Sequence, residues 1–106
     1  MANAILMASG LGSRMRPLTN TTPKPLIKVN NTPMIETVIN ALEMAGVEHI
    51  FVVVGYLGEQ FSYLTDKYSN VSIINNTDYE TVNNISSIYY AREEMKKSDV
   101  YICEAD

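Results

Sequence analysis

One segment of the chain, residues 49–54, limits what the fold can be. It reads His-Ile-Phe-Val-Val-Val, a run of apolar and mostly β-branched residues that stops at Gly55. A continuous apolar run of this length is typical of a strand buried on both faces, as strands are in a parallel sheet. Successive parallel strands need long crossover connections, usually helical, so helical segments should separate the strands.

Three further apolar runs, separated by segments with helical periodicity, complete an alternating pattern. Such alternation is typical of an α/β fold, in which right-handed crossovers place helices on both faces of a parallel sheet. The sequence therefore predicts a single domain of this class over residues 1–106. The expected strands are 4–7, 49–54, 71–74 and 100–103, and the expected helices are 33–45, 57–68 and 85–95.

The helix expected at 33–45 has signals at both ends. Thr32 can cap its start, Pro33 fits its first turn, and Gly46 can end it. Its apolar residues fall on one face, which would pack against the sheet.

Composition narrows the class of protein. The chain has 106 residues, is 46% hydrophobic, and contains no apolar run of about eighteen residues that could span a membrane. No basic segment suggests a signal peptide near the N-terminus. The single Cys103 cannot form an internal disulfide, which fits a reducing compartment, so we expect a cytoplasmic location. The net charge of −4 argues against binding to nucleic acid or to an anionic membrane.

The charges are unevenly distributed. Residues 1–35 contain Arg14, Arg16, Lys24 and Lys28 but no acidic residue, whereas all twelve acidic residues follow. A local basic cluster in an acidic chain indicates a small anionic ligand, although a solvated basic loop would give the same pattern.

The basic residues lie in a glycine-containing loop directly after the first expected strand. Gly10 and Gly12 let main-chain N–H groups approach a phosphate or a base without a Cβ in the way. Arg14 offers paired donors to phosphate oxygens, and Lys24 offers a point charge. This combination suits a nucleoside triphosphate. It is neither the dinucleotide fingerprint, because Pro17 does not continue a helix, nor a Walker A loop, because Gly-Lys-Ser/Thr is absent.

The spacing of these residues resembles the nucleotidyltransferases that make NDP-sugars and CDP-alcohols. The resemblance covers essentially all 106 residues, and only Ser9 departs from the usual alanine. It implies a Rossmann-like fold, of which this chain would be the N-terminal half. The matching segments are Ala8-Ser9-Gly10-Leu11-Gly12-Ser13-Arg14, Pro17-Leu18-Thr19, Pro23-Lys24 and Pro33-Met34-Ile35.

Within that family, the segment after the third expected strand distinguishes subgroups. Sugar nucleotidyltransferases usually carry Gly-Thr-Ala-Gly there, whereas this chain has Asn83-Asn84-Ile85-Ser86-Ser87. This pattern is similar to bacterial CTP:phosphocholine cytidylyltransferases. The expected reaction is transfer of CMP from CTP, or of another nucleotide, to a phosphorylated alcohol such as phosphocholine, with release of pyrophosphate. A sugar-1-phosphate nucleotidyltransferase and a non-catalytic nucleotide-binding regulatory module remain alternatives.

The resemblance also implies roles for single residues. Lys24 would bridge the α-phosphate and the incoming phosphate, and Arg14 would hold the β- and γ-phosphates. Asp106 would be one ligand of Mg²⁺, a hard cation suited to carboxylate and phosphate oxygens. In the family a second aspartate, much later in the sequence and absent from these 106 residues, completes the site. Tyr79 is a candidate for the acceptor site, where an aromatic face could bind a quaternary ammonium. The residues expected to contact the nucleotide are Ala8, Ser9, Gly10, Leu11, Gly12, Ser13 and Asn84, the last of which could instead be only a helix cap.

The last expected strand leads directly to Asp106. We interpret this as truncation after a strand end, which would leave the strand edge exposed and able to form a homo-oligomer. If this strand pairs with the first, Asp106 and loop 8–24 would face each other across the ligand crevice.

Overall fold

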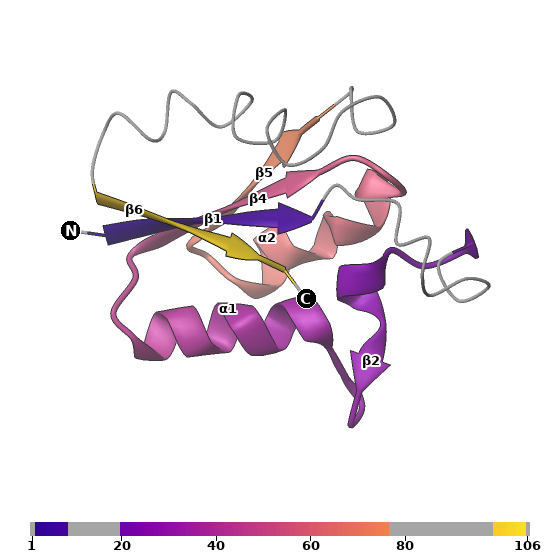
Figure 1. Ribbon diagram of the computed structural model, residues 1–106, viewed down its shortest axis with the longest axis horizontal. Helices are drawn as coiled ribbons and strands as arrows, with labels where there is room; N and C mark the ends of the chain where they lie inside the picture. The colour runs from indigo at the N-terminus through magenta and orange to yellow at the C-terminus, as the bar shows by residue number, and fades with distance from the viewer. Residues whose placement is uncertain (1, 9–19, 77–98, 106) are drawn as a thin grey trace.

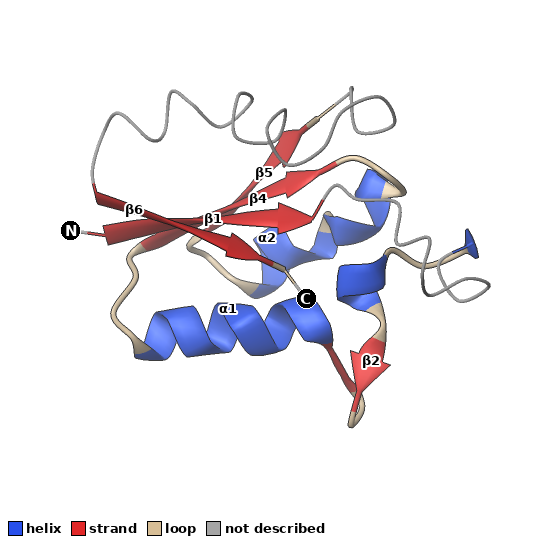
Figure 2. Ribbon diagram, viewed as in Figure 1, coloured by secondary structure: helices blue, strands red, loops and turns tan. Residues whose placement is uncertain are grey.

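The computed structural model describes residues 2–8, 20–76 and 99–105. Four parallel strands form the main sheet in the order β5-β4-β1-β6 (Figures 1 and 2). The strands are β1 (Ala2–Ala8), β4 (His49–Val54), β5 (Val71–Asn75) and β6 (Asp99–Glu104). All four strands expected from the sequence are confirmed, and the bounds of β4 agree at both ends.

β1 lies in the interior of the sheet and pairs with strands on both sides. Ala4 is opposite Ile50 of β4 and Tyr101 of β6, and the same register continues along β1. The chain therefore adds β4 and β5 on one side of β1 and then returns to add β6 on the other. This reversal of strand order creates a topological switch point between β1 and β6.

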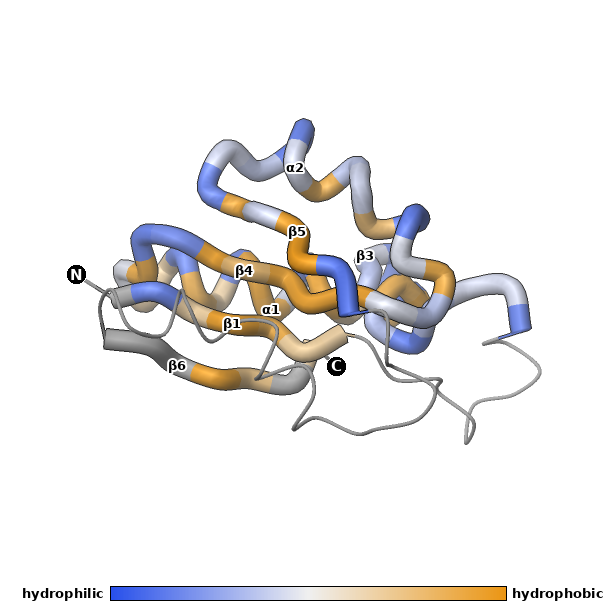
Figure 3. The backbone as a smooth tube through the Cα atoms, turned by 90° about the horizontal axis from the view of Figure 1, so that it is seen from above, coloured by the Kyte–Doolittle hydropathy of each residue, from blue (hydrophilic) through white to orange (hydrophobic). Residues whose placement is uncertain are grey.

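One face of the sheet is covered by two helices, α1 (Met34–Met44) and α2 (Tyr63–Lys67). Ile35 and Ile39 of α1 pack into the same buried cluster as Leu64 of α2 and the alternate residues of β1 and β4. Figure 3 shows the hydrophobic residues concentrated along the strands, while much of α2 is hydrophilic. The opposite face carries a second cluster around Ile5 and Val53. The helix expected at 85–95 lies outside the described residues.

The start of α1 differs from the prediction. Pro33 is the N-cap residue, and no side chain caps the helix. Thr32 instead lies in the short strand β3 (Thr32–Pro33). The N–H of Met34 donates to the carbonyl of Ile27 at 3.1 Å, so a backbone bond satisfies the group that a threonine cap was expected to serve.

The end of α1 agrees with the prediction. Gly46 has φ +88°, the left-handed conformation that favours glycine. Its N–H donates to the carbonyl of Glu43, and the N–H of Val47 donates to that of Leu42. This pair of bonds is a Schellman motif, which satisfies carbonyls left open at the helix end.

A β-hairpin that the sequence analysis did not predict precedes α1. It joins β2 (Lys28–Val29) to β3 through Asn30 and Asn31, both of which have positive φ. Two left-handed residues between antiparallel strands form a type I′ turn, and asparagine tolerates this conformation well.

The second expected helix, 57–68, is divided. Leu57 adopts the left-handed conformation, with φ +53°. A 3₁₀ turn, η4 (Gly58–Phe61), follows, and α2 begins only after Ser62. The periodicity was nevertheless informative, because Phe61 and Leu64 are fully buried.

Within the described residues, no helix combines the length and the apolar character that crossing a membrane requires.

Candidate functional site

The carboxyl ends of β1 and β6 lie side by side at the switch point. Ala8 ends β1 and is buried. Ala105, just after β6, is also buried, and its N–H donates to the carbonyl of Met7 at 3.3 Å. The chain therefore enters the segment 9–19 and reaches Asp106 from neighbouring positions on the same edge of the sheet. Ligands of open α/β sheets bind at such an edge.

Lys24 opens a short 3₁₀ turn, η3 (Lys24–Leu26), between two buried prolines. The N–H of Leu26 donates to the carbonyl of Pro23 at 2.9 Å, and the N–H of Ile27 donates to that of Lys24 at 3.1 Å. Pro23 and Pro25 fix their own φ angles, which restricts the backbone on both sides of the lysine. Figure 1 shows this turn at the same end of the molecule as the carboxyl ends of β1 and β6. Lys24 is therefore a cation on a restrained backbone beside the switch point.

Two hydrogen bonds tie the segment around Lys24 to the rest of the fold. Nε2 of Gln60, in η4, donates to the carbonyl of Thr21 at 2.8 Å. On the other side of the turn, the carbonyl of Ile27 accepts from the N–H of Met34 at the start of α1. The segment 21–27 is thus attached near both of its ends.

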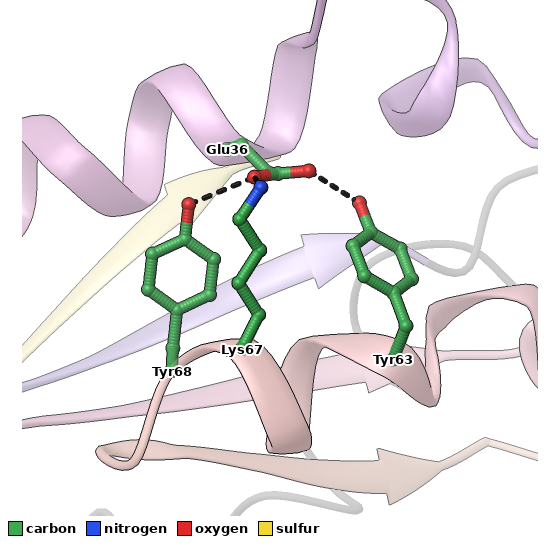
Figure 4. Close-up of polar contacts among 4 residues, drawn as sticks. All are labelled: Glu36, Tyr63, Lys67 and Tyr68. Atoms are coloured by element: carbon green, nitrogen blue, oxygen red, sulfur yellow. Dashed lines mark hydrogen bonds and ion pairs between the residues drawn. The ribbon is translucent and has the colours of Figure 1, made fainter.

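A buried carboxylate joins α1 to α2. Glu36, in the first turn of α1, is only 4% exposed. Its Oε2 accepts a hydrogen bond from the hydroxyl of Tyr63 at 2.6 Å, and its Oε1 accepts one from Tyr68 at 2.8 Å (Figure 4). Nζ of Lys67 lies 2.6 Å from the same Oε1. Both carboxylate oxygens are therefore satisfied by residues of, or adjoining, α2.

These contacts shift three pKa values. Burial alone would raise the pKa of Glu36, but the hydrogen bonds from Lys67, Tyr63 and Tyr68 outweigh it and lower the pKa below its ordinary value. Burial and the hydrogen bond to Glu36 raise the pKa of Tyr68 to about 12. The same causes raise the pKa of Tyr63. At neutral pH the glutamate is therefore ionised and both tyrosines are protonated.

No pattern in the sequence indicates the Glu36 cluster or the Gln60 contact. Both join residues that are far apart in sequence, and no local spacing connects them. Part of the cluster borders an open recess of about 470 Å³ that is also lined by Leu26 of the Lys24 turn. The recess is lined by Thr22, Leu26, Lys28, Asn31, Pro33, Glu36, Gln60, Tyr63 and Lys67.

Only part of the predicted site falls within the described residues. Ala8 does, as the last residue of β1, and Lys24 does, as the first residue of η3. The other predicted site residues lie outside the described residues: Ser9, Gly10, Leu11, Gly12, Ser13, Arg14, Tyr79, Asn84 and Asp106.

The expected metal site depends on Asp106. Among residues 2–8, 20–76 and 99–105, no group of three or more His, Cys, Asp or Glu side chains is arranged to hold a metal ion. Mg²⁺ at nucleotide sites is usually held by one or two carboxylates together with substrate phosphates. Asp106 follows the buried Ala105 in sequence and lies outside the described residues.

Comparison with known proteins identifies the family. A sequence model described as nucleotidyl transferase matches residues 3–106, nearly the whole chain. The chain belongs to the nucleotidyl transferase family. This confirms the family that the glycine-loop and Pro-Lys motifs predicted. The expected fold class, a Rossmann-like parallel sheet with helices, is also confirmed.

The similar proteins include cytidylyltransferases. The chain is 64% identical over 104 residues to 2-aminoethylphosphonate cytidylyltransferase from Lancefieldella rimae, covering 98% of this chain and 42% of that protein. It is 46% identical over 103 residues to choline-phosphate cytidylyltransferase from Streptococcus pneumoniae, covering 97% and 44%. The solved structure of the CTP:phosphocholine cytidylyltransferase from Streptococcus pneumoniae superposes with a TM-score of 0.92 at 45% identity, covering 99% of this chain and 45% of that one. The chain thus spans less than half the length of these relatives.

Proposed function

We propose that the protein carrying this chain is a cytidylyltransferase. It transfers CMP from CTP to a small amino-alcohol phosphate or aminoalkylphosphonate and releases pyrophosphate. The observation that carries this proposal is the Lys24 turn, a cation held between two buried prolines beside the β1–β6 switch point. The cytidylyltransferase names of the similar proteins support the choice of nucleotide.

The reaction brings two anions together. An oxygen of the acceptor's phosphoryl or phosphonyl group attacks the α-phosphorus of CTP and forms a new P–O–P linkage. The bond from the α-phosphorus to the oxygen that bridges to the β-phosphate breaks, and pyrophosphate leaves with that electron pair. No proton transfer is required, so the protein's contribution is alignment and neutralisation of negative charge.

Each proposed residue has a role in that neutralisation. Lys24 contacts both the α-phosphate and the attacking group, and its restrained backbone keeps the charge in place as the two approach. Arg14 holds the β- and γ-phosphates through paired N–H donors. Residues 8–13 bind the nucleotide, partly through backbone N–H groups, and Asn84 adds a side-chain contact. Asp106 would hold Mg²⁺, which supplies further stabilisation of the charge on the phosphates.

The acceptor class follows from the names of the similar proteins together with the predicted residues. Phosphocholine and 2-aminoethylphosphonate share a phosphorus-bound oxyanion at one end and a positively charged nitrogen at the other. Tyr79 is proposed to lie against the nitrogen, as an aromatic face can for a cation. The protein would act in the cytoplasm, where CTP is available.

A matrix of substrates tests this proposal. Pyrophosphate release by the complete protein is measured with CTP, UTP, dTTP and ATP, each combined with phosphocholine, 2-aminoethylphosphonate and a hexose 1-phosphate. The expected result is fastest turnover with CTP and one of the two amino-phosphorus acceptors. Faster turnover with the hexose 1-phosphate would overturn the acceptor class, and binding of nucleotide without any turnover would favour a regulatory module.

A further inference from the structure

The contact between Gln60 and Thr21 joins two parts of the chain that are 39 residues apart in sequence. Gln60 lies in η4, which follows the carboxyl end of β4, and Thr21 lies three residues before Lys24. Nε2 of Gln60 donates to the Thr21 carbonyl at 2.8 Å. The Gln60 side chain therefore connects η4, at the carboxyl end of β4, to the segment that leads into the Lys24 turn.

The η4 turn is a firm support for this contact. The N–H of Gly58 donates to the carbonyl of Gly55, and the N–H of Gln60 donates to that of Leu57. Phe61, next to Gln60, is fully buried in the core. A Cβ added at Gly58 would lie only 3.0 Å from a methyl group of Val54, so η4 lies directly against the end of β4. The position of Gln60 is thus fixed by the central sheet.

The Lys24 segment has a second attachment on its other side. The carbonyl of Ile27 accepts from Met34 N–H, which ties the end of the turn to α1. Buried Pro23 and Pro25 and the core-packed Leu26 hold the turn itself, and the two hydrogen bonds add an attachment on either side of Lys24. Gln60 provides the attachment on the N-terminal side.

We propose that Gln60 is a positioning residue for the transfer reaction. Its amide holds the Thr21 carbonyl and thereby sets where Lys24 meets the phosphates. The inference rests on the proposed function, in which Lys24 contacts the reacting groups. The contact is exposed, so water can satisfy the Thr21 carbonyl, but only a side-chain donor ties that carbonyl to η4, and an ionised glutamate offers none at neutral pH. A glutamate would also place negative charge beside Thr21, in the N-terminal part of the chain, where residues 1–35 contain no acidic residue.

Gln60→Glu and Gln60→Ala in the complete protein test the proposal. Glu59→Gln is the matched control, because Glu59 is the exposed neighbour of Gln60 in the same turn. A displacement of about 1 Å at a reacting centre can cost ~10²-fold in rate, so we expect kcat to fall at least about 10-fold in both Gln60 variants. The KM for CTP should change far less, and the control should keep wild-type kcat.

Hydrogen exchange gives a readout that does not depend on activity. The amides of Leu26 and Ile27 donate within the Lys24 turn, so both should exchange faster in the Gln60 variants while amides of β4 stay protected. A second readout is the combination of Gln60→Ala with Lys24→Ala. If Gln60 acts through Lys24, the double variant should turn over no more slowly than Lys24→Ala alone.

The possible results separate the positioning role of Gln60 from the proposed role of Lys24 in transfer. Wild-type kcat in Gln60→Glu together with a severe loss in Lys24→Ala would overturn the positioning role and leave the proposed function standing. A loss that multiplies fully in the double variant, or unchanged exchange at Leu26 and Ile27, would also overturn it. Near-wild-type turnover in Lys24→Ala would overturn the proposed role of Lys24, and the positioning role with it, even if exchange at Leu26 and Ile27 were faster.

Discussion

The hydroxyl of Tyr63 donates a 2.6 Å hydrogen bond to Oε2 of Glu36, and this contact connects α2 to the first turn of α1. The other carboxylate oxygen is engaged by Tyr68 and Lys67 (Figure 4). Because η3 and the start of α1 are joined through Ile27 and Met34, the cluster supports the same end of α1 that holds the Lys24 turn.

Glu36→Gln is expected to destabilise the complete protein. The substitution removes a charged acceptor while leaving two tyrosine hydroxyls and a lysine around it, and losing hydrogen bonds to a charged group costs about 1–3 kcal/mol. Urea unfolding at pH 7 measures the change in the free energy of unfolding. Glu43→Gln is the matched control, because Glu43 is an exposed glutamate on the same helix and should change stability little.

The stability of Glu36→Gln relative to wild type should also depend on pH in the acidic range. The pKa of Glu36 is lower in the folded protein than its ordinary value of 4.5. Its contribution to stability is therefore complete above about pH 4.5 and is lost as pH falls through the lower, folded pKa. The difference in unfolding free energy between wild type and Glu36→Gln should shrink below pH 4.5. A difference that stays constant down to pH 3 would contradict the shift.

A second pH prediction concerns alkaline conditions. The pKa of Tyr68 is raised from 10 to about 12, so its contribution is complete below pH 10 and is lost as pH rises towards 12. Tyr68→Phe removes the titrating hydroxyl and should make stability fall less steeply between pH 10 and 12. Tyrosinate absorbance followed during titration provides the direct check, and titration of Tyr68 near pH 10 in the folded protein would contradict the prediction.

Much of the fold could be predicted because its signals are local. The run at 49–54 marks β4 without reference to any partner, and Gly46 marks the end of α1 through its own backbone conformation. The Asn30–Asn31 turn was also local, but asparagine pairs occur in many loops, and the short strands beside it give little periodicity. The helix expected at 57–68 was divided because Leu57 adopts a left-handed conformation that apolar spacing does not reveal.

The site was predicted only where a family motif covered it. Lys24 was found because two prolines and a glycine loop identify it, and the structure adds that both prolines are buried. Glu36 reads in the sequence as an ordinary acidic residue in a helix's first turn. Only the packing of α2 against α1 shows that Tyr63, Lys67 and Tyr68 surround it.

Lys24→Ala should severely reduce transfer without unfolding the protein. Losing a fixed charge that stabilises the transition state costs on the order of 10²-fold or more in kcat. Lys28→Ala is the matched control, since Lys28 carries the same charge on the exposed hairpin strand β2. Steady-state pyrophosphate release and melting temperature are measured for both. Equal activity in the two variants would remove Lys24 from the mechanism.

Gly46→Ala should destabilise the protein through backbone conformation alone. A Cβ at this position would contact nothing within 4 Å, so no side-chain clash arises. The cost comes from φ +88°, and forcing an L-residue into the left-handed region costs roughly 1–2 kcal/mol. Gly46→Asn should cost less, because asparagine tolerates this region better. Chemical denaturation of both variants gives the comparison, and equal stability of Gly46→Ala and wild type would contradict the argument.

The isolated 106-residue chain should self-associate and lack activity. β6 has no neighbour on its outer side in the described sheet, and Ile102 on this strand is 40% exposed. Unpaired strand edges invite pairing with a second chain, and two copies can pair about a two-fold axis. Activity should be absent because the chain spans only 42–44% of the length of the two cytidylyltransferases compared above. Sedimentation across a concentration series, with a turnover assay alongside, measures both. Ile102→Lys places a charge on the edge strand and should weaken association. A strictly monomeric wild-type chain would refute the association, and measurable CMP transfer would show that these residues suffice for catalysis.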